Sequence, residues 1–122
     1  MRLDKWAVTA QEALQAAVGV ATDAEAGQVQ PVHLLKALLS SGERNLRAII
    51  ERVGADPASI EAQTDQAIAR QPKVTGGSAQ MGVGNDLVRV GDAAEKLASK
   101  MGDSYVTSEH LLCALADSKD EA

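Results

Sequence analysis

Hydrophobic residues recur at steps of three and four along most of the chain, which is the pattern of amphipathic helices. In the first stretch the apolar positions are Ala10, Ala13, Leu14, Ala17, Val20, Ala21 and Ala24. Thr9 and Glu12 can form a capping box at its start. Alternatively, Asp4 can cap an earlier turn, which would direct Trp6 inward. Either way, the pattern predicts one long first helix.

Turn residues divide the rest of the first half into three further helices. Pro31 favours the first position of a short helix, "PVHLLKALLS", because the N–H that proline lacks has no partner there. The next helix, in "GERNLRAIIERV", ends before Gly54, a residue type common just after a helix. Asp56 as N-cap and Pro57 at the first position then begin a helix that reaches Arg70.

Residues 71–85 contain four glycines and a proline and follow neither the helical nor the strand period. We therefore expect a surface connection, with residues 72–84 as the least ordered interior segment. Asn85 or Asp86 can cap a following long helix, and Thr107 or Ser108 a short one, which makes six helices in all. The apolar stripe of the long helix comprises Leu87, Val90, Ala94, Leu97, Ala98 and Met101.

The chain contains an internal repeat. Shifting the sequence by 77 residues aligns 14–38 with 91–115 without a gap, and "HLLKAL" with "HLLCAL". Each copy has too little apolar surface to close a core alone, so the copies should pack as a pseudo-twofold pair. We therefore predict an all-α single domain over 1–122, with repeat one at about 4–70, a glycine-rich linker at 71–85 and repeat two at 86–122.

Composition restricts the possible partners. Apolar residues make up 45% of the chain, but Trp6 and Tyr105 are the only aromatics, so the core must be aliphatic. The net charge is −5, without the basic cluster that nucleic acid requires. Cys113 is the only cysteine, and no apolar run approaches the roughly 18 residues of a membrane span. We expect a soluble cytoplasmic domain that binds neither nucleic acid nor membrane.

Motifs for catalysis and cofactors are not found. "GGSAQMGVG" is rich in glycine but lacks the Gly-Lys-Ser/Thr ending of a phosphate-binding loop, so we expect no ATP binding. His110 and Cys113 are three residues apart without a further ligand pair, so we expect no metal site. We expect His33 and His110 to be structural and the chain to be non-catalytic.

Several stretches resemble the amino-terminal domain of Clp/Hsp100 AAA+ chaperones. They are "MRLDKWAVTAQEAL", the paired "HLLKALL" and "HLLCALA", "NDLVRV" and "EKLASKMGDSYVTSEHLL". Within the family, the ClpB-type disaggregases are the most similar branch. Each repeat has four helices in that family, whereas the second repeat here shows two. The resemblance thus implies a truncated second repeat, with apolar surface uncovered around Leu112 and Leu115.

The resemblance also implies a function. Such a domain recruits substrate by weakly binding exposed apolar segments of unfolded or aggregated proteins. The whole protein would be a homohexamer whose other modules bind ATP and Mg²⁺. The substrate groove would have an apolar floor and an acidic rim. The resemblance assigns to this groove Ala7, Thr9, Val90, Leu97, Asp103 and Glu109, with Ala7 in place of the family's usual threonine.

Other interpretations remain open. Asp103 follows Gly102 in a turn and Glu109 lies in the first turn of a helix, so both acids can be purely structural. The domain could instead dock adaptor proteins, as in ClpA/ClpC-type protease unfoldases. Phosphoarginine recognition is disfavoured because Val32 replaces a glutamate of that site. A stand-alone structural protein that dimerises is a further alternative.

Overall fold

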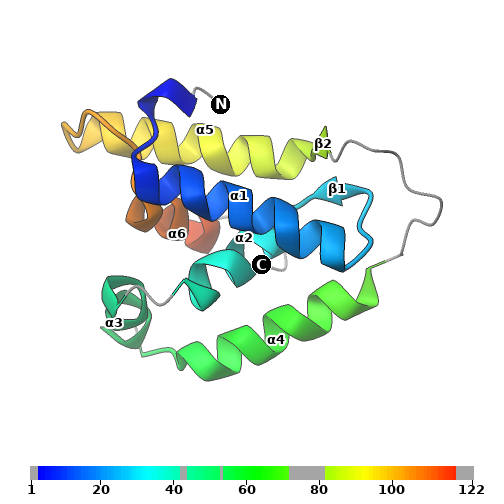
Figure 1. Ribbon diagram of the computed structural model, residues 1–122. Helices are drawn as coiled ribbons and strands as arrows, with labels where there is room; N and C mark the ends of the chain where they lie inside the picture. Colours follow the sequence, from blue (N-terminus) through cyan, green and yellow to red (C-terminus); the bar gives the residue numbers. More distant parts are fainter. Residues whose placement is uncertain (1–2, 42–43, 53, 72–81, 118–122) are drawn as a thin grey trace.

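The computed structural model describes residues 3–41, 44–52, 54–71 and 82–117. Within them the chain forms six α-helices, one 3₁₀ turn and two very short strands, which confirms the all-α prediction (Figure 1). The elements are η1 (Leu3–Lys5), α1 (Val8–Asp23), β1 (Gln28–Val29), α2 (Pro31–Ser40), α3 (Arg44–Arg52), α4 (Pro57–Arg70), β2 (Gly82–Val83), α5 (Asn85–Lys100) and α6 (Ser108–Asp117).

The start of α1 differs from both predicted caps. Its N-cap is Ala7, and no side chain caps the helix, so neither Thr9 nor Asp4 has the predicted role. Trp6 nevertheless points inward and is buried. The Ala7 N–H donates to the Val106 carbonyl oxygen at 2.7 Å. A backbone contact with repeat two, which local sequence cannot reveal, therefore fixes the start of α1.

The predicted end of α3 and the predicted start of α4 are confirmed. Gly54 follows α3 with φ +84°, and Asp56 accepts a hydrogen bond from the Ala58 N–H at 3.2 Å, with Pro57 first in α4. At α5 the prediction was wrong: its N-cap is Gly84, without a side-chain cap. α6 begins at Ser108, which places Thr107 at the N-cap position.

The helices confirm the internal repeat. α1 and α5 are each 16 residues long, α2 and α6 are each 10, and the corresponding bounds lie 77 residues apart. The two histidines make equivalent hydrogen bonds at Nδ1. Nδ1 of His33 accepts the Gln30 N–H at 2.8 Å, and Nδ1 of His110 accepts the Thr107 N–H at 2.9 Å. The residue pattern and the backbone therefore repeat together.

Two short parallel pairings connect the repeats and were not predicted. Val29 of β1 pairs with Val83 of β2, and Trp6 forms a bridge with Val106. The same 77-residue shift relates the two pairings, so each repeat contributes one segment to both. Gly82 and Val83 consequently belong to a strand and not to a loop, whereas the remaining predicted connection, 72–81, lies outside the described residues. Strands of two residues are too short to show the alternation of apolar and polar residues by which a strand is predicted from a sequence.

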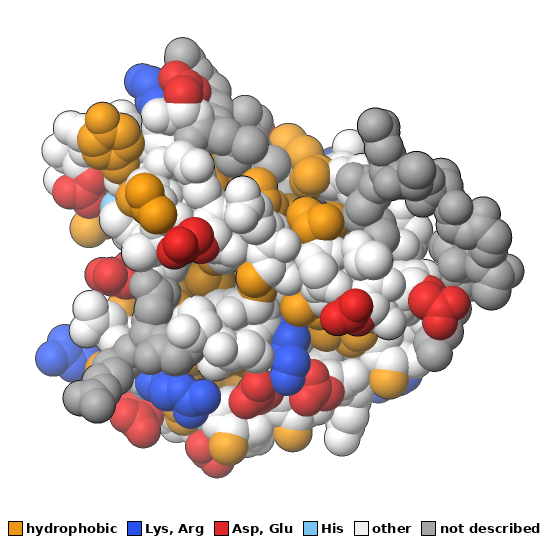
Figure 2. All heavy atoms as spheres, in the orientation of Figure 1, with side chains coloured by type: hydrophobic (Ala, Val, Ile, Leu, Met, Phe, Trp, Pro, Cys, Tyr) orange, Lys and Arg blue, Asp and Glu red, His pale blue; other side chains and the backbone are white. Residues whose placement is uncertain are grey.

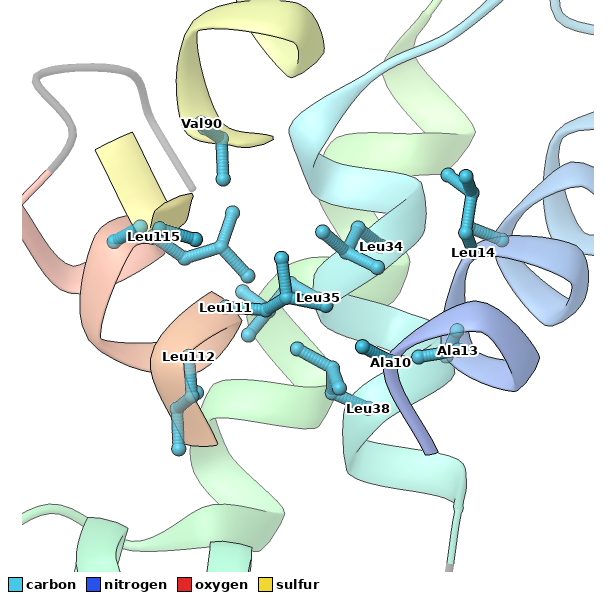
Figure 3. Packing of buried hydrophobic residues seen from close by; sticks show 14 of the residues in the cluster. Ala10, Ala13, Leu14, Leu34, Leu35, Leu38, Val90, Leu111, Leu112 and Leu115 are labelled. Atoms are coloured by element: carbon cyan, nitrogen blue, oxygen red, sulfur yellow. The ribbon is translucent and has the colours of Figure 1, made fainter. Parts of the chain in front are cut away.

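One aliphatic core contains residues from both repeats. The leucines of α2 and α6 lie between α1 and α5, with Leu34 and Leu111 at the centre (Figure 3). Leu112 and Leu115 are also buried, so the prediction of an uncovered surface around them was wrong. The physical reason is that α6 packs against several helices, namely α5 of its own repeat and α1, α2 and α3 of repeat one. Among the described side chains of α6, those left exposed are Glu109, Cys113 and Ala116.

Candidate functional site

A groove of about 500 Å³ lies where α5 is followed by α6. We call it the α5–α6 groove. Three elements line it: α3 contributes one residue, α5 and the following turn several, and α6 the rest. Its apolar or sulfur-bearing side chains are Ile49, Leu97, Met101, Tyr105 and Cys113, and its acidic ones are Asp103 and Glu109.

Large apolar side chains are unusually exposed at this groove. Met101 is 62% exposed and Tyr105 58% exposed. Hydrophobic, acidic and histidine side chains lie close together at the left of Figure 2, at the end where α5 is followed by α6 in Figure 1. Apolar surface that remains in water is available to a partner, because covering it is favourable.

The turn after α5 has a defined backbone. Gly102 has φ +79°, the left-handed conformation that glycine adopts without a steric penalty. Its N–H donates to the Ser99 carbonyl oxygen at 3.0 Å, and the Asp103 N–H donates to that of Ala98 at 2.8 Å. This pair of bonds is the Schellman arrangement at a helix C-terminus. It holds the Asp103 backbone in place at the edge of the groove.

The Asp103 side chain is held as well. His110 is only 6% exposed, and its Nε2 lies 2.9 Å from Oδ2 of Asp103. The Asp103 side chain itself is 47% exposed. Glu109 precedes His110 in the first turn of α6 and is exposed. The rim thus carries one carboxylate fixed by a buried imidazole and a second that faces water.

The structure brings together three of the six residues assigned to the groove by sequence, namely Leu97, Asp103 and Glu109. Val90 was misplaced: it is buried and lies close to Leu111 and Leu115 in the core (Figure 3). It belongs to the stripe of α5 that packs on α6 and does not line this groove.

The two assigned residues near the amino terminus do not line this groove. Ala7 is half-buried and bonded to the Val106 backbone, and Thr9 is exposed on α1. They therefore lie outside the groove, although the Trp6–Val106 bridge brings their segment beside the α5–α6 connection.

Seven of the ten groove residues were not assigned to it from the sequence, among them the large apolar residues Met101, Tyr105 and Ile49. Met101 was predicted to face the core, but it lies at the C-cap of α5, past the last turn that packs inside. Tyr105 had a weak signal, since it is an aromatic residue within a polar turn. Ile49 had none, because only tertiary packing brings α3 to α6.

A second hollow, of about 660 Å³, adjoins the groove. The two share Asp103, Ser104 and Tyr105. The second hollow is more polar, being lined also by Lys5, Asp92, Glu95, Lys96 and Ser99. Glu95 accepts a hydrogen bond from the Trp6 indole N–H at 3.0 Å. An extended ligand that crosses Tyr105 would meet apolar surface on one side and charges of both signs on the other.

Repeat one covers the corresponding face of its short helix. Val32 and Lys36 of α2 are the equivalents of Glu109 and Cys113, and α4 packs on this side of α2. Nζ of Lys36 lies 2.9 Å from Glu61 and 3.0 Å from Asp65. The hydrogen bond with Glu61 raises the pKa of Lys36, and the same bond lowers the pKa of Glu61. The corresponding hollow of repeat one, between α2 and α4, is smaller, at about 410 Å³.

The groove offers noncovalent binding. Among the described residues, no three His, Cys, Asp or Glu side chains lie together as metal ligands would. In the same part of the chain, no helix has both the length and the apolar composition needed to cross a membrane. The side chains that line the groove offer apolar contact, hydrogen bonds to carboxylates and charge pairing.

The fold defines a pseudo-twofold helical repeat domain with a groove at its second repeat. The Clp repeat (R) N-terminal domain family matches residues 5–122, and the chain belongs to this family. It is 39% identical over 116 residues to chaperone protein ClpB of Agrobacterium fabrum, covering 95% of this chain and 13% of the relative. It is 37% identical over 121 residues to chaperone protein ClpB of Rhodopseudomonas palustris, covering 98% of this chain and 14% of the relative. The chain therefore spans about one seventh of these relatives.

Solved structures share the fold. The Hsp104 N-terminal domain from Candida albicans has a TM-score of 0.85 at 20% identity, over 94% of this chain and 75% of that one. The N-terminal domain of the ClpV1 ATPase from E. coli has a TM-score of 0.83 at 24% identity, over 94% of this chain and 69% of that one. At these identities the likeness establishes the fold.

Proposed function

We propose that this chain is the substrate-recruiting amino-terminal domain of a ClpB-type disaggregase and that the α5–α6 groove binds exposed apolar segments of unfolded or aggregated polypeptides. One observation carries the proposal: Met101 and Tyr105 expose apolar surface beside Leu97, and Asp103 and Glu109 lie at the edge. The 39% identity to a ClpB chaperone supports it.

The groove suits a ligand of variable sequence. Apolar burial is worth roughly 25 cal/mol per Å² whatever the side chain, so it tolerates sequence differences. The carboxylates of Asp103 and Glu109 accept hydrogen bonds from peptide N–H groups or pair with Lys and Arg. Such contacts are individually weak, which allows fast release to a later step.

The rest of the proposed protein supplies the chemistry. The domain itself is non-catalytic in this proposal and holds no cofactor. ATP and Mg²⁺ bind to separate AAA+ modules of a cytoplasmic homohexamer, and the domain passes polypeptide to them. This part rests on the ClpB relatives, of which the chain covers 13–14%.

The test is a titration with an unstructured peptide of Leu, Arg and Ser residues, against the wild type and an Asp103→Ala, Glu109→Ala variant. Exposed charge pairs contribute at most about 1 kcal/mol each, so the variant should bind roughly ten- to thirtyfold more weakly. The matched control is Glu12→Ala, Asp23→Ala, which changes the net charge equally at exposed positions of α1. Circular dichroism checks that both variants fold.

Two results would contradict the proposal. Equal weakening in the α1 control would mean that overall charge, and not the groove, attracts the peptide. If the folded wild type fails to bind at a peptide concentration of about 500 µM, docking of a folded adaptor, as in ClpA/ClpC-type unfoldases, becomes the better proposal.

A further inference from the structure

We propose that His110 is a positioning residue of the α5–α6 groove: it orients the Asp103 carboxylate toward the ligand and so gives the groove its preference for basic segments. This inference rests on the proposed function of the groove. Its starting point is the 2.9 Å contact between Nε2 of His110 and Oδ2 of Asp103.

The bonding of the imidazole determines which nitrogen carries the proton. The Thr107 backbone N–H donates to Nδ1 at 2.9 Å, so Nδ1 must be unprotonated. In the neutral ring the proton then resides on Nε2, which donates to Asp103. His110 is 6% exposed and has one backbone anchor, so its ring is a rigid donor.

Repeat one shows what the histidine does without this contact. Nδ1 of His33 accepts the Gln30 N–H at 2.8 Å, just as His110 accepts that of Thr107. Nε2 of His33, however, is buried and has no hydrogen-bond partner. The residue equivalent to Asp103 is Ala26. Capping the short helix therefore needs only Nδ1, and the Nε2 contact is an additional feature of the repeat that carries the groove.

The contact with His110 occupies only part of the Asp103 carboxylate, so the remainder can bind a ligand. One carboxylate oxygen, Oδ2, is taken by His110, and the side chain remains 47% exposed. Fixing one oxygen restricts rotation of the carboxylate, so Oδ1 is held ready for a ligand donor. Because this ordering is complete before binding, a ligand guanidinium loses less free energy in pairing with it.

The experiment separates the two roles of the imidazole by substitution. In His110→Asn, the amide oxygen replaces Nδ1 as acceptor for the Thr107 N–H, and nothing reaches Asp103. His33→Asn is the matched control, since it changes the same position in repeat one, where no carboxylate is present. The probes are the unstructured Leu/Arg/Ser peptide and the same peptide with citrulline, the neutral isostere, at every arginine.

The wild type and His33→Asn should bind the arginine peptide about fivefold more tightly than the citrulline peptide, whereas His110→Asn should lose most of this preference. In an Asp103→Ala background, His110→Asn should have no further effect, because the histidine acts through the carboxylate. The inference would be overturned if folded His110→Asn kept the full preference for the arginine peptide. It would also be overturned if His110→Asn reduced this preference as much in the Asp103→Ala background as in the wild type. Failure of the wild type to bind either peptide would instead overturn the proposed function.

A measurement without ligand tests the geometry itself. Nitrogen-15 NMR of the imidazole rings should show His110 protonated at Nε2 in the neutral ring, with a proton shift that changes in Asp103→Ala. A neutral His110 protonated at Nδ1 would contradict the proposed contact, whatever the peptides do.

Discussion

At the residue scale, the equivalent positions Glu25 and Gly102 both terminate a long helix, but the required backbone conformation costs more free energy for glutamate than for glycine. Each follows a long helix in the left-handed region, with φ 57° for Glu25 and 79° for Gly102. Each is part of the same pair of closing hydrogen bonds, to Thr22 and Ser99 respectively. A side chain in this conformation brings Cβ close to a carbonyl oxygen, and glycine avoids this. Repeat one therefore contains a local strain that repeat two lacks.

Replacing Glu25 with glycine should raise the free energy of unfolding by about 0.5–1 kcal/mol, because glycine removes the steric cost. Gly102→Ala should lower it by about 1 kcal/mol for the converse reason. A Cβ at Gly102 would meet nothing within 4 Å, so the effect is one of backbone conformation alone. Urea unfolding followed by circular dichroism measures both changes. A destabilising Glu25→Gly would show that the glutamate side chain contributes more than its backbone costs.

His33 is a second residue whose environment has a measurable consequence. It is 0% exposed, and burial lowers its pKa below 6.5. The side chain of Gln71 acts in the opposite direction, but burial outweighs it, and Nε2 of His33 has no hydrogen-bond partner. The folded protein therefore resists protonation of this ring.

The wild type should lose stability as the pH falls below about 6.5, because the unfolded state then binds a proton that folded His33 does not. The loss should continue until the pH reaches the lowered pKa of the folded state, and no such loss should occur above 6.5. His33→Asn removes this contribution, so urea unfolding at about pH 7.5 and pH 5.5 should show a smaller difference for the variant. Equal pH dependence in the two proteins would contradict the assignment.

At the element scale, the two short pairings tie the repeats to each other. The amide N–H groups of Ala7, Gly84 and Val106 donate across the repeats at 2.7, 2.9 and 2.8 Å. The Ala7 bond lies just before α1, the Gly84 bond just before α5, and the Val106 bond between α5 and α6. The helices α1 and α5 are thereby fixed at their N-terminal ends by the partner repeat and not by side-chain caps.

These three amides should exchange with solvent as slowly as the best protected core amides, because their bonds break only when the repeats separate. Hydrogen exchange followed by NMR tests this. The internal control is the Thr9 amide, which lies in the first turn of α1 and has no partner within the helix. Exchange of all three as fast as Thr9, with core amides still protected, would show that the pairings open locally.

At the scale of the whole molecule, the two repeats form one body. α1 and α3 of repeat one contact α6, and α2 contacts α5. The buried leucines of both short helices meet in one core (Figure 3). The groove follows from this arrangement, since Ile49 of repeat one closes a surface that otherwise belongs to repeat two. The α5–α6 groove is therefore formed by the two repeats together.

Three of the ten residues that line the candidate groove were assigned from the sequence through its resemblance to known domains. Leu97, Asp103 and Glu109 are close together in the chain, so a local turn between two helices suffices to gather them. Val90 was misjudged because a helix stripe indicates apolar residues without showing which of them an opposing helix covers. Met101 was misjudged for the converse reason, since the stripe continued past the end of the covered surface.

The sequence by itself determined the six helices, the repeat and the equivalent positions of His33 and His110 in it. These depend on periodicity, on turn residues and on a constant offset, all of which are local or self-comparing properties. Only the tertiary structure decided that Leu112 and Leu115 are buried, that the backbones pair at Val106 and Val83, and that His110 has an acceptor which His33 lacks. Those features arise from contacts between residues far apart in the chain or across a turn, and their energies depend on distances that the order of residues does not specify.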